Sequence, residues 1–364
     1  MKKGRILLIV SLLLLGFAAS LTVSCDKKSN DPDIPNDTIP DDTTNLVVPA
    51  GWSKVGDLNA NDMIWSITSD GSGHIYAGGY FTNSGGYRYV ARWNGTTWED
   101  IGLNANGSIY ALTTDAGGNI YAVGDFTNGA TPGGGNRYVA RWNGSSWSDI
   151  GPSGNNLTLS ADGAGNVYNG PSKWDGTTWT DFAAMYPEMY GSIESLATTF
   201  SGDAQYAGGS FGHTSGYRYV ARWNGTAWSE PGTLNANANI HAVVTDHSGN
   251  VYAAGSFTNG NLPTTGHQYV AKWDGTSWSE LGSLNANGAI YSLAVDNNTG
   301  YVYASGYFTN ADGKSYVAKW DGTSWSDLGD MALSPAPIYV DASGKLYSVI
   351  ASHDGRIFCV VVHD

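Results

Sequence analysis

The chain has 364 residues, of which 41% are hydrophobic and 14% charged, so it carries enough apolar side chains to bury a core. Its 32 acidic residues outnumber 18 basic ones, and the formal net charge of −14 repels nucleic-acid phosphates, so we expect no nucleic-acid partner. Two cysteines at opposite ends of the chain, Cys25 and Cys359, exclude a disulfide framework.

The first segment has the layout of an export signal. A basic head that ends at Arg5 precedes an apolar run over residues 6–19, and small residues then lead to Cys25. This run is too short for a stable membrane span. The segment resembles a bacterial lipoprotein signal, and the resemblance implies that residues 1–24 are removed and that Cys25 is lipidated. A plain signal peptide cleaved nearby is the alternative.

The next segment, residues 25–50, is rich in Asp and Pro and has few large apolar side chains. Such a composition does not repay the entropy of ordering the chain, so we expect a flexible acidic tether. Together with the signal, the tether predicts a protein that reaches the membrane through its lipid anchor. We expect it at the outer membrane or cell surface of a Gram-negative bacterium.

A tryptophan repeat dominates the rest of the chain. Six copies of Trp-(Asn/Asp)-Gly-x-x-Trp contain 12 of the 14 Trp, and the lone Trp52 provides a seventh closing segment. A repeat of this regularity indicates an array of similar structural units. The second Trp of each copy is Trp98, Trp147, Trp179, Trp228, Trp278 and Trp325.

Each repeat predicts four short strands. Segments rich in β-branched and aromatic residues alternate with Gly, Asn and Asp turns, and no segment has a helical period. The Asn-Gly or Asp-Gly between the two Trp predicts a tight hairpin. With a two-residue turn, Trp93 would pair with Thr96 and Ala91 with Trp98, which places both indoles on one buried face.

Four-stranded units with this period predict an all-β, seven-bladed β-propeller over residues 51–364. The second strand gives an independent count, because a short Tyr-centred segment also occurs seven times. The last blade has only three strands of its own, so we expect the N-terminal strand at Trp52 to complete it. These second strands lie at residues 74–78, 119–124, 166–168, 204–208, 250–254, 301–305 and 345–348.

The repeat also resembles known propeller families. Ile-Tyr-Ala-Gly-Gly at 75–79, Tyr-Val-Ala-Arg-Trp at 89–93 and Trp98 are similar to the kelch repeat, and the first strand with its turn resembles NHL-type repeats. The resemblance covers residues 51–364 and implies a propeller architecture, which specifies a scaffold far better than an activity.

An Asp opens the turn after the first strand in six blades. None of these turns shows the full ligand series of a calcium loop, whereas Asp often caps such turns through its own side chain. We therefore expect turn chemistry and no metal site. The residues are Asp70, Asp115, Asp162, Asp246, Asp296 and Asp341.

One position varies between blades while its neighbours repeat. It lies five residues before the turn position, at the start of the innermost strand, so its side chains should surround one mouth of the central channel. The set is Trp65, Tyr110, Leu157, Glu194, His241, Tyr291 and Ala336. The connection before blade four adds Tyr186, Glu188 and Tyr190, beside a blade three that lacks one loop. We expect a lopsided groove there.

These features favour a binding protein. Aromatic faces beside a few polar groups suit a sugar ring or an aromatic-rich peptide, so we expect a non-catalytic, monomeric propeller that binds a glycan or protein without a cofactor. The candidate ligand-binding residues are Trp65, Tyr110, Tyr186, Glu188, Tyr190, Glu194, His241 and Tyr291. The alternative is a polysaccharide lyase or glycoside hydrolase that uses Glu194 and His241. A spacer without a ligand is the third possibility.

Overall fold

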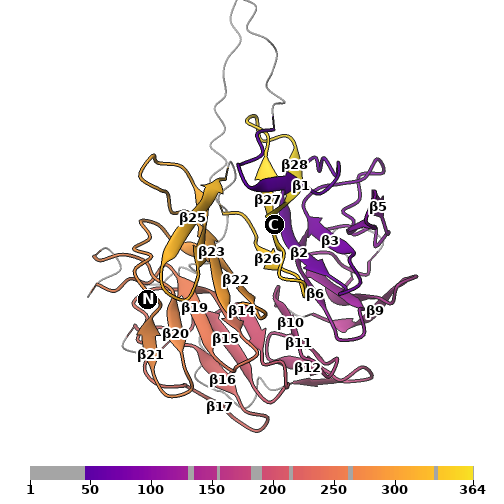
Figure 1. The fold of residues 1–364 in the computed structure, drawn as a ribbon. Helices are drawn as coiled ribbons and strands as arrows, with labels where there is room; N and C mark the ends of the chain where they lie inside the picture. The colour runs from indigo at the N-terminus through magenta and orange to yellow at the C-terminus, as the bar shows by residue number, and fades with distance from the viewer. Residues whose placement is uncertain are drawn as a thin grey trace, which may run out of the picture. The chain divides into compact units, whose positions relative to one another are not determined.

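The computed structural model describes residues 46–129, 135–153, 156–181, 191–212, 216–260, 265–331 and 335–363. These ranges form seven antiparallel sheets of four strands each, which confirms the predicted seven-bladed propeller (Figure 1). The expected signal, Cys25 and the tether as far as residue 45 lie outside the described residues. Among the residues that are described, no helix is long and apolar enough to cross a membrane.

Blades 1 to 3 follow one another along the chain. Blade 1 contains β2 (Ile64–Ser69), β3 (Ile75–Gly79), β4 (Ala91–Trp93) and β5 (Trp98–Asp100). Blade 2 contains β6 (Ile109–Thr114), β7 (Ile120–Gly124), β8 (Tyr138–Trp142) and β9 (Trp147–Pro152). Blade 3 is the short blade, with β10 (Leu159–Ala161), β11 (Val167–Asn169), β12 (Ser172–Trp174) and β13 (Trp179–Asp181).

Blades 4 to 6 repeat the same order. Blade 4 contains β14 (Ile193–Thr198), β15 (Gln205–Gly209), β16 (Ala221–Trp223) and β17 (Trp228–Ser229). Blade 5 contains β18 (Ile240–Thr245), β19 (Val251–Gly255), β20 (Ala271–Trp273) and β21 (Trp278–Glu280). Blade 6 contains β22 (Ile290–Asp296), β23 (Tyr301–Gly306), β24 (Tyr316–Trp320) and β25 (Trp325–Asp330).

Blade 7 joins the two ends of the domain, as predicted. Its order is β26 (Tyr339–Val340), β27 (Leu346–Ala351), β28 (Phe358–His363) and finally β1 (Trp52–Lys54). Trp52 lies opposite His363 in the antiparallel β1–β28 pair. Contacts between β22 and β26 and between β2 and β27 complete the ring. The terminal strand therefore removes a sheet edge that would otherwise remain unpaired.

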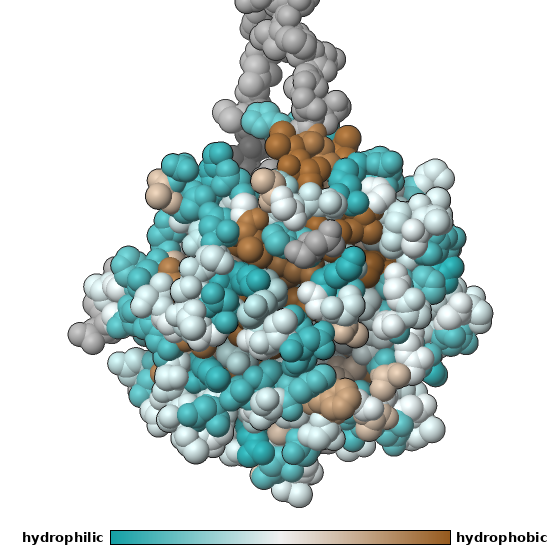
Figure 2. Space-filling model, in the orientation of Figure 1, coloured by the Kyte–Doolittle hydropathy of each residue, from teal (hydrophilic) through white to brown (hydrophobic). Residues whose placement is uncertain are grey.

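The hydrophobic core lies between neighbouring blades. The second strands are buried along their whole length except for Tyr301 at the start of β23, and small Ala side chains such as Ala77 and Ala122 let adjacent sheets approach each other. A Phe that follows this strand fills the space at one end, and it is at most 1% exposed in five blades: Phe81, Phe126, Phe211, Phe257 and Phe308. The face shown in Figure 2 is mainly hydrophilic, with hydrophobic colour gathered in the upper part of the view, near blade 7.

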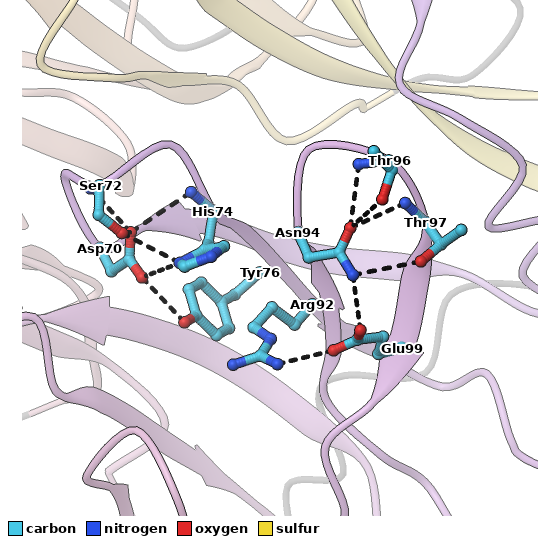
Figure 3. Close-up of polar contacts among 9 residues, drawn as sticks. All are labelled: Asp70, Ser72, His74, Tyr76, Arg92, Asn94, Thr96, Thr97 and Glu99. Carbon is cyan, nitrogen blue, oxygen red and sulfur yellow. Dashed lines mark hydrogen bonds and ion pairs between the residues drawn. The ribbon is translucent and has the colours of Figure 1, made fainter.

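The two Trp of each repeat pack more closely than predicted. Trp93 lies directly opposite Trp98, with ring centroids 5.9 Å apart, so the predicted pairing of Trp93 with Thr96 is wrong. The turn has four residues because the Asn94 side chain organises it: its Oδ1 accepts the backbone N–H groups of Thr96 and Thr97, each at 2.9 Å (Figure 3). Gly95 in this turn adopts a positive φ of 96°.

In five of the six repeats, the second Trp also connects neighbouring blades. The Trp98 indole N–H donates to the Val55 carbonyl at 2.5 Å, and Trp147 donates to Ile101 at 3.1 Å. Trp52 makes the same bond to Leu328 at 2.7 Å, which joins blade 7 to blade 6. Trp179, Trp278 and Trp325 repeat it. The repeated Trp thus provides both apolar burial and a directed bond between sheets.

The Asp turns follow the predicted turn chemistry. Asp70 Oδ1 accepts the backbone N–H of Ser72 at 2.9 Å, and Asp70 Oδ2 accepts the Tyr76 hydroxyl at 3.0 Å and contacts His74 Nδ1 at 2.6 Å (Figure 3). Hydrogen bonds from Ser72, His74 and Tyr76 outweigh burial and lower the pKa of Asp70. The Tyr-to-Asp bond recurs at Asp115, Asp162, Asp246 and Asp341.

Candidate ligand-binding site at one mouth of the ring

In five of the seven blades, the variable position of the innermost strand is the extra residue of a β-bulge. In blade 5, Ile240 pairs with Gly255 and Ala242 pairs with Ala254, so His241 has no partner across the ladder. A bulge redirects one side chain away from the regular alternation of the strand. The same shift occurs at Trp65, Tyr110, Glu194 and Tyr291.

A glycine opposite each bulge makes this geometry possible. A Cβ on Gly255 would lie 2.9 Å from Ile240 Cα and would overlap with the Asn239 carbonyl oxygen. Backbone atoms cannot move aside as a flexible side chain does, so the position requires Gly. Gly79, Gly124, Gly209 and Gly306 occupy the corresponding positions.

A second set of side chains meets the bulge residues, and the sequence analysis missed it. In four blades these residues directly follow the glycine: Tyr80, Asp125, Ser256 and Tyr307. Ser210 occupies the same position in blade 4, but its hydroxyl accepts the Ser192 backbone N–H instead. The signal was present in the repeat, because this position varies between blades while the Gly before it and the Phe after it recur.

The first cluster lies in blades 1 and 2. The rings of Trp65 and Tyr80 meet edge to face, with centroids 5.5 Å apart, and the hydroxyls of Tyr80 and Tyr110 lie 3.3 Å apart. Asp125 accepts the Tyr110 hydroxyl at 3.5 Å and also the Ser108 backbone N–H. Burial, the Tyr80 hydrogen bond and the Asp125 charge raise the pKa of Tyr110, so it remains a neutral hydrogen-bonding group at physiological pH.

The second cluster runs through blades 4, 5 and 6. His241 Nδ1 lies 2.5 Å from Glu194 Oε2, and the Tyr291 ring stacks on the imidazole with centroids 4.2 Å apart and an angle of 9°. Tyr307 meets Tyr291 edge to face at 5.2 Å. Burial and the neighbouring Tyr307 and Glu194 raise the pKa of Tyr291. Asn239 donates to the other carboxylate oxygen of Glu194 at 3.1 Å.

The structure brings five predicted residues into these two clusters. Trp65 and Tyr110 belong to the first cluster, and Glu194, His241 and Tyr291 belong to the second. Leu157 precedes a shortened strand, and Ala336 is buried at 3% exposure, so neither follows the bulge pattern. Tyr186, Glu188 and Tyr190 lie outside the described residues, so the lopsided groove stays a prediction.

A cavity of about 510 Å³ lies at the other end of the channel, away from these clusters. Residues at the far ends of all the innermost strands line it, among them Thr114, Thr198 and Tyr339. Its Asp side chains are engaged in the turns described above. The mouth with the bulges is the better candidate site, because its side chains differ between blades and include exposed aromatic rings: Trp65 is 37% exposed and Tyr291 39%.

Fold and site define the class of this protein as a seven-bladed β-propeller with a chemically varied channel mouth. No protein-family model and no curated protein matches the sequence. Solved structures do match. The GH74 enzyme of Niastella koreensis is 17% identical with a TM-score of 0.58, over 85% of this chain and 53% of that one. This chain therefore spans about half of that enzyme.

Two other solved propellers match along nearly their whole length. The WD40 β-propeller domain of Doa1 is 12% identical with a TM-score of 0.56, over 86% of this chain and 98% of that one. YCF48 bound to D1 peptide is 15% identical with a TM-score of 0.55, over 87% and 98%. At these identities the likeness establishes the propeller fold alone.

Proposed function

We propose that this protein binds a glycan at the bulged mouth of the propeller while a lipid on Cys25 anchors it at the outer membrane or cell surface. The observation that carries the proposal is the bulge position: in five blades it presents side chains of four different types at the same mouth. Residues 25–50 would act as the tether, and recognition would require no metal or cofactor.

The chemistry of the two clusters suits sugar rings. Exposed aromatic faces at Trp65 and Tyr291 can cover the apolar face of a pyranose, and Asp125 and Glu194 can accept hydrogen bonds from its hydroxyls. The predicted loop residues Tyr186, Glu188 and Tyr190 would extend this surface. A protein ligand is the competing occupant, as in the YCF48 structure with its D1 peptide.

The alternative of a lyase or glycoside hydrolase has weaker support. Both carboxylate oxygens of Glu194 are engaged, one by Asn239 and the other by His241. A carboxylate held in this way is suited to orienting the imidazole rather than to protonating a glycosidic oxygen. Hydrolysis of a glycosidic bond ordinarily uses two carboxyl groups on either side of that bond.

Glycan-array binding by the purified full chain tests the proposal. We expect Trp65→Ala and Tyr291→Ala to lose binding, because each removes an exposed ring from the mouth. Phe200→Ala is the matched control: this ring is 63% exposed but lies at the opposite cavity, so binding should be unchanged. Binding that survives both mouth substitutions would reject this site, and binding only to peptides would favour the protein ligand.

Metabolic labelling with palmitate tests the anchor. Incorporation into the wild-type chain and its loss in Cys25→Ser are the expected results, whereas an unlabelled wild-type chain would contradict lipidation.

A further inference from the structure

Three side chains of the second cluster form a continuous line of hydrogen bonds. Ser256 Oγ lies 2.8 Å from His241 Nε2, and His241 Nδ1 lies 2.5 Å from Glu194 Oε2. A carboxylate can only accept a hydrogen bond, so the proton of the neutral imidazole is assigned to Nδ1. The lone pair is then on Nε2, and the Ser256 hydroxyl donates to it.

Surrounding contacts hold this line in place. Asn239 Nδ2 donates to Glu194 Oε1 and leaves Oε2 for His241, while Tyr291 stacks flat on the imidazole. The Ser256 backbone N–H donates to the Asn239 carbonyl at 2.9 Å, which fixes the strand end that carries the hydroxyl. The imidazole orientation is therefore determined by the β-bulge, by a carboxylate and by an aromatic face.

We propose that Ser256, His241 and Glu194 hydrolyse acyl esters, with Ser256 as nucleophile, His241 as general base and Glu194 as positioning residue. A serine hydroxyl becomes a competent nucleophile when a histidine accepts its proton and a carboxylate orients that histidine. The His241 side chain is 11% exposed, the Glu194 side chain is 25% exposed and Ser256 is partly exposed, so an ester at the mouth reaches the hydroxyl.

This inference goes beyond the proposed binding function, since recognition of a glycan requires no nucleophile. The two proposals meet in the substrate class: an O-acylated saccharide presents both a sugar ring for the aromatic residues and an ester for Ser256. The hydrogen bonds that join Ser256, His241 and Glu194 do not depend on which ligand the aromatic residues bind.

The reaction would proceed in two balanced steps. Ser256 Oγ bonds to the ester carbonyl carbon as its proton passes to His241 Nε2, and the bond from this carbon to the alkoxy oxygen breaks as His241 protonates the departing alcohol. A water molecule then gives a proton to His241 and attacks the acyl carbon. The bond from that carbon to Oγ breaks, and Ser256 regains its proton. One ester and one water yield one alcohol and one carboxylic acid.

Blade 4 supplies a matched control within the same chain. Ser210 follows Gly209 as Ser256 follows Gly255, but the Ser210 hydroxyl accepts the Ser192 backbone N–H at 2.9 Å, and the bulge residue of its blade is Glu194 rather than a histidine. Ser210→Ala thus removes an equivalent hydroxyl from the same mouth without touching the proposed nucleophile.

Labelling of the purified full chain with a fluorophosphonate probe, followed by peptide mass spectrometry, provides the first test. We expect modification at Ser256 in the wild-type chain and in Ser210→Ala, and none in Ser256→Ala. Hydrolysis of p-nitrophenyl acetate and of an O-acetylated xylan provides the second test. Ser256→Ala and His241→Ala should lower the rate by about 10³-fold or more, and Ser210→Ala should leave it unchanged.

Glu194 requires a readout that a purely structural role would not affect. We expect Glu194→Gln to reduce hydrolysis and probe labelling strongly while the denaturation midpoint changes little, and Glu194→Asp to recover part of the rate. A wild-type chain that is neither labelled nor active on either ester would overturn the proposal, as would full activity in Ser256→Ala. Labelling of the wild-type chain needs no variant, so it decides the question even if Ser256→Ala fails to fold.

Discussion

Replacing Gly255 by Ala should damage both the stability of blade 5 and the candidate site. The new Cβ would lie 2.9 Å from Ile240 Cα and 3.0 Å from the Asn239 carbonyl carbon, and closer still to its oxygen. Ordinary carbon contacts are about 3.5–4.0 Å, so the backbone of β18 or β19 must move by roughly 0.5–1 Å. Overpacking of this kind costs about 1–3 kcal/mol of unfolding free energy.

The same displacement should disturb the residues that flank the bulge. His241 lies between the two pairs that would have to move, and Ser256 directly follows the substituted glycine. We therefore expect a lower urea midpoint together with weaker glycan binding. Gly85→Ala is the control, because there the atoms nearest to a Cβ belong to the side chains of Asn83 and Tyr87, at 3.3 Å, and not to the backbone. A Gly255→Ala chain with wild-type stability would refute the argument that the bulge requires glycine.

Three further predictions concern the scaffold. Trp52→Ala should destabilise the propeller by about 3–5 kcal/mol in urea unfolding, because it empties a buried site and removes the bond to Leu328; an unchanged midpoint would contradict the ring closure. Tyr121→Phe should cost about 1 kcal/mol through the lost bond to buried Asp115, measured in the same assay, and a neutral result would show that bond to be dispensable. Hydrogen bonds from Thr276 and Ser277 lower the pKa of Asp274 to about 2 from an ordinary 3.8. The stabilisation of the folded state by the ionised Asp274 is therefore complete above pH 4 and disappears as the pH falls through 2. Asp274→Asn should flatten the dependence of the urea midpoint on pH across this window, and an unaltered pH profile would oppose the assignment.

The blade number could be predicted because packing imposes the same residues on every blade. The closing Trp and the Tyr-centred strand are separate requirements of the fold, and both occur seven times when Trp52 is included. The closure by β1 followed from the same count, since the last repeat lacked one strand. The turn Asp residues were predictable as well, because Asp caps turns through its own carboxylate.

The register of the Trp hairpin could not be obtained from turn propensity. Asn-Gly is typical of two-residue hairpins, but the Asn94 side chain accepts two successive backbone N–H groups and stabilises a four-residue turn instead. This arrangement places Trp93 opposite Trp98, where the rings contact each other directly. A local preference was therefore overridden by side-chain hydrogen bonding and by the direct contact of the two indoles.

The position of each bulge residue could be predicted, but its contacts could not. His241 and Glu194 were predicted together and do contact each other, but the contacts of His241 with Ser256 and Tyr291 were not predicted. The contacts of Tyr110 with Tyr80 and Asp125 were not predicted either. Contacts across blades depend on rotamers and on the bulge twist, which no spacing in the sequence encodes. Ser256 was overlooked for a related reason: its importance arises only from its distance to His241.

The bulge explains how a repeated scaffold accommodates a varied site. Ile240 before His241 and Ala242 after it are buried against the neighbouring sheets, so their sizes are determined by packing. His241 itself is the extra residue and has no partner across the ladder, so its size and charge are not limited by the alternation that buries its neighbours. Each of the five bulged blades thus contributes folding free energy through its repeated positions and one chemically independent side chain to the mouth. A carboxylate, an imidazole and a phenol can then follow one another in blades 4, 5 and 6, which a regular strand with the same packing could not present to one ligand.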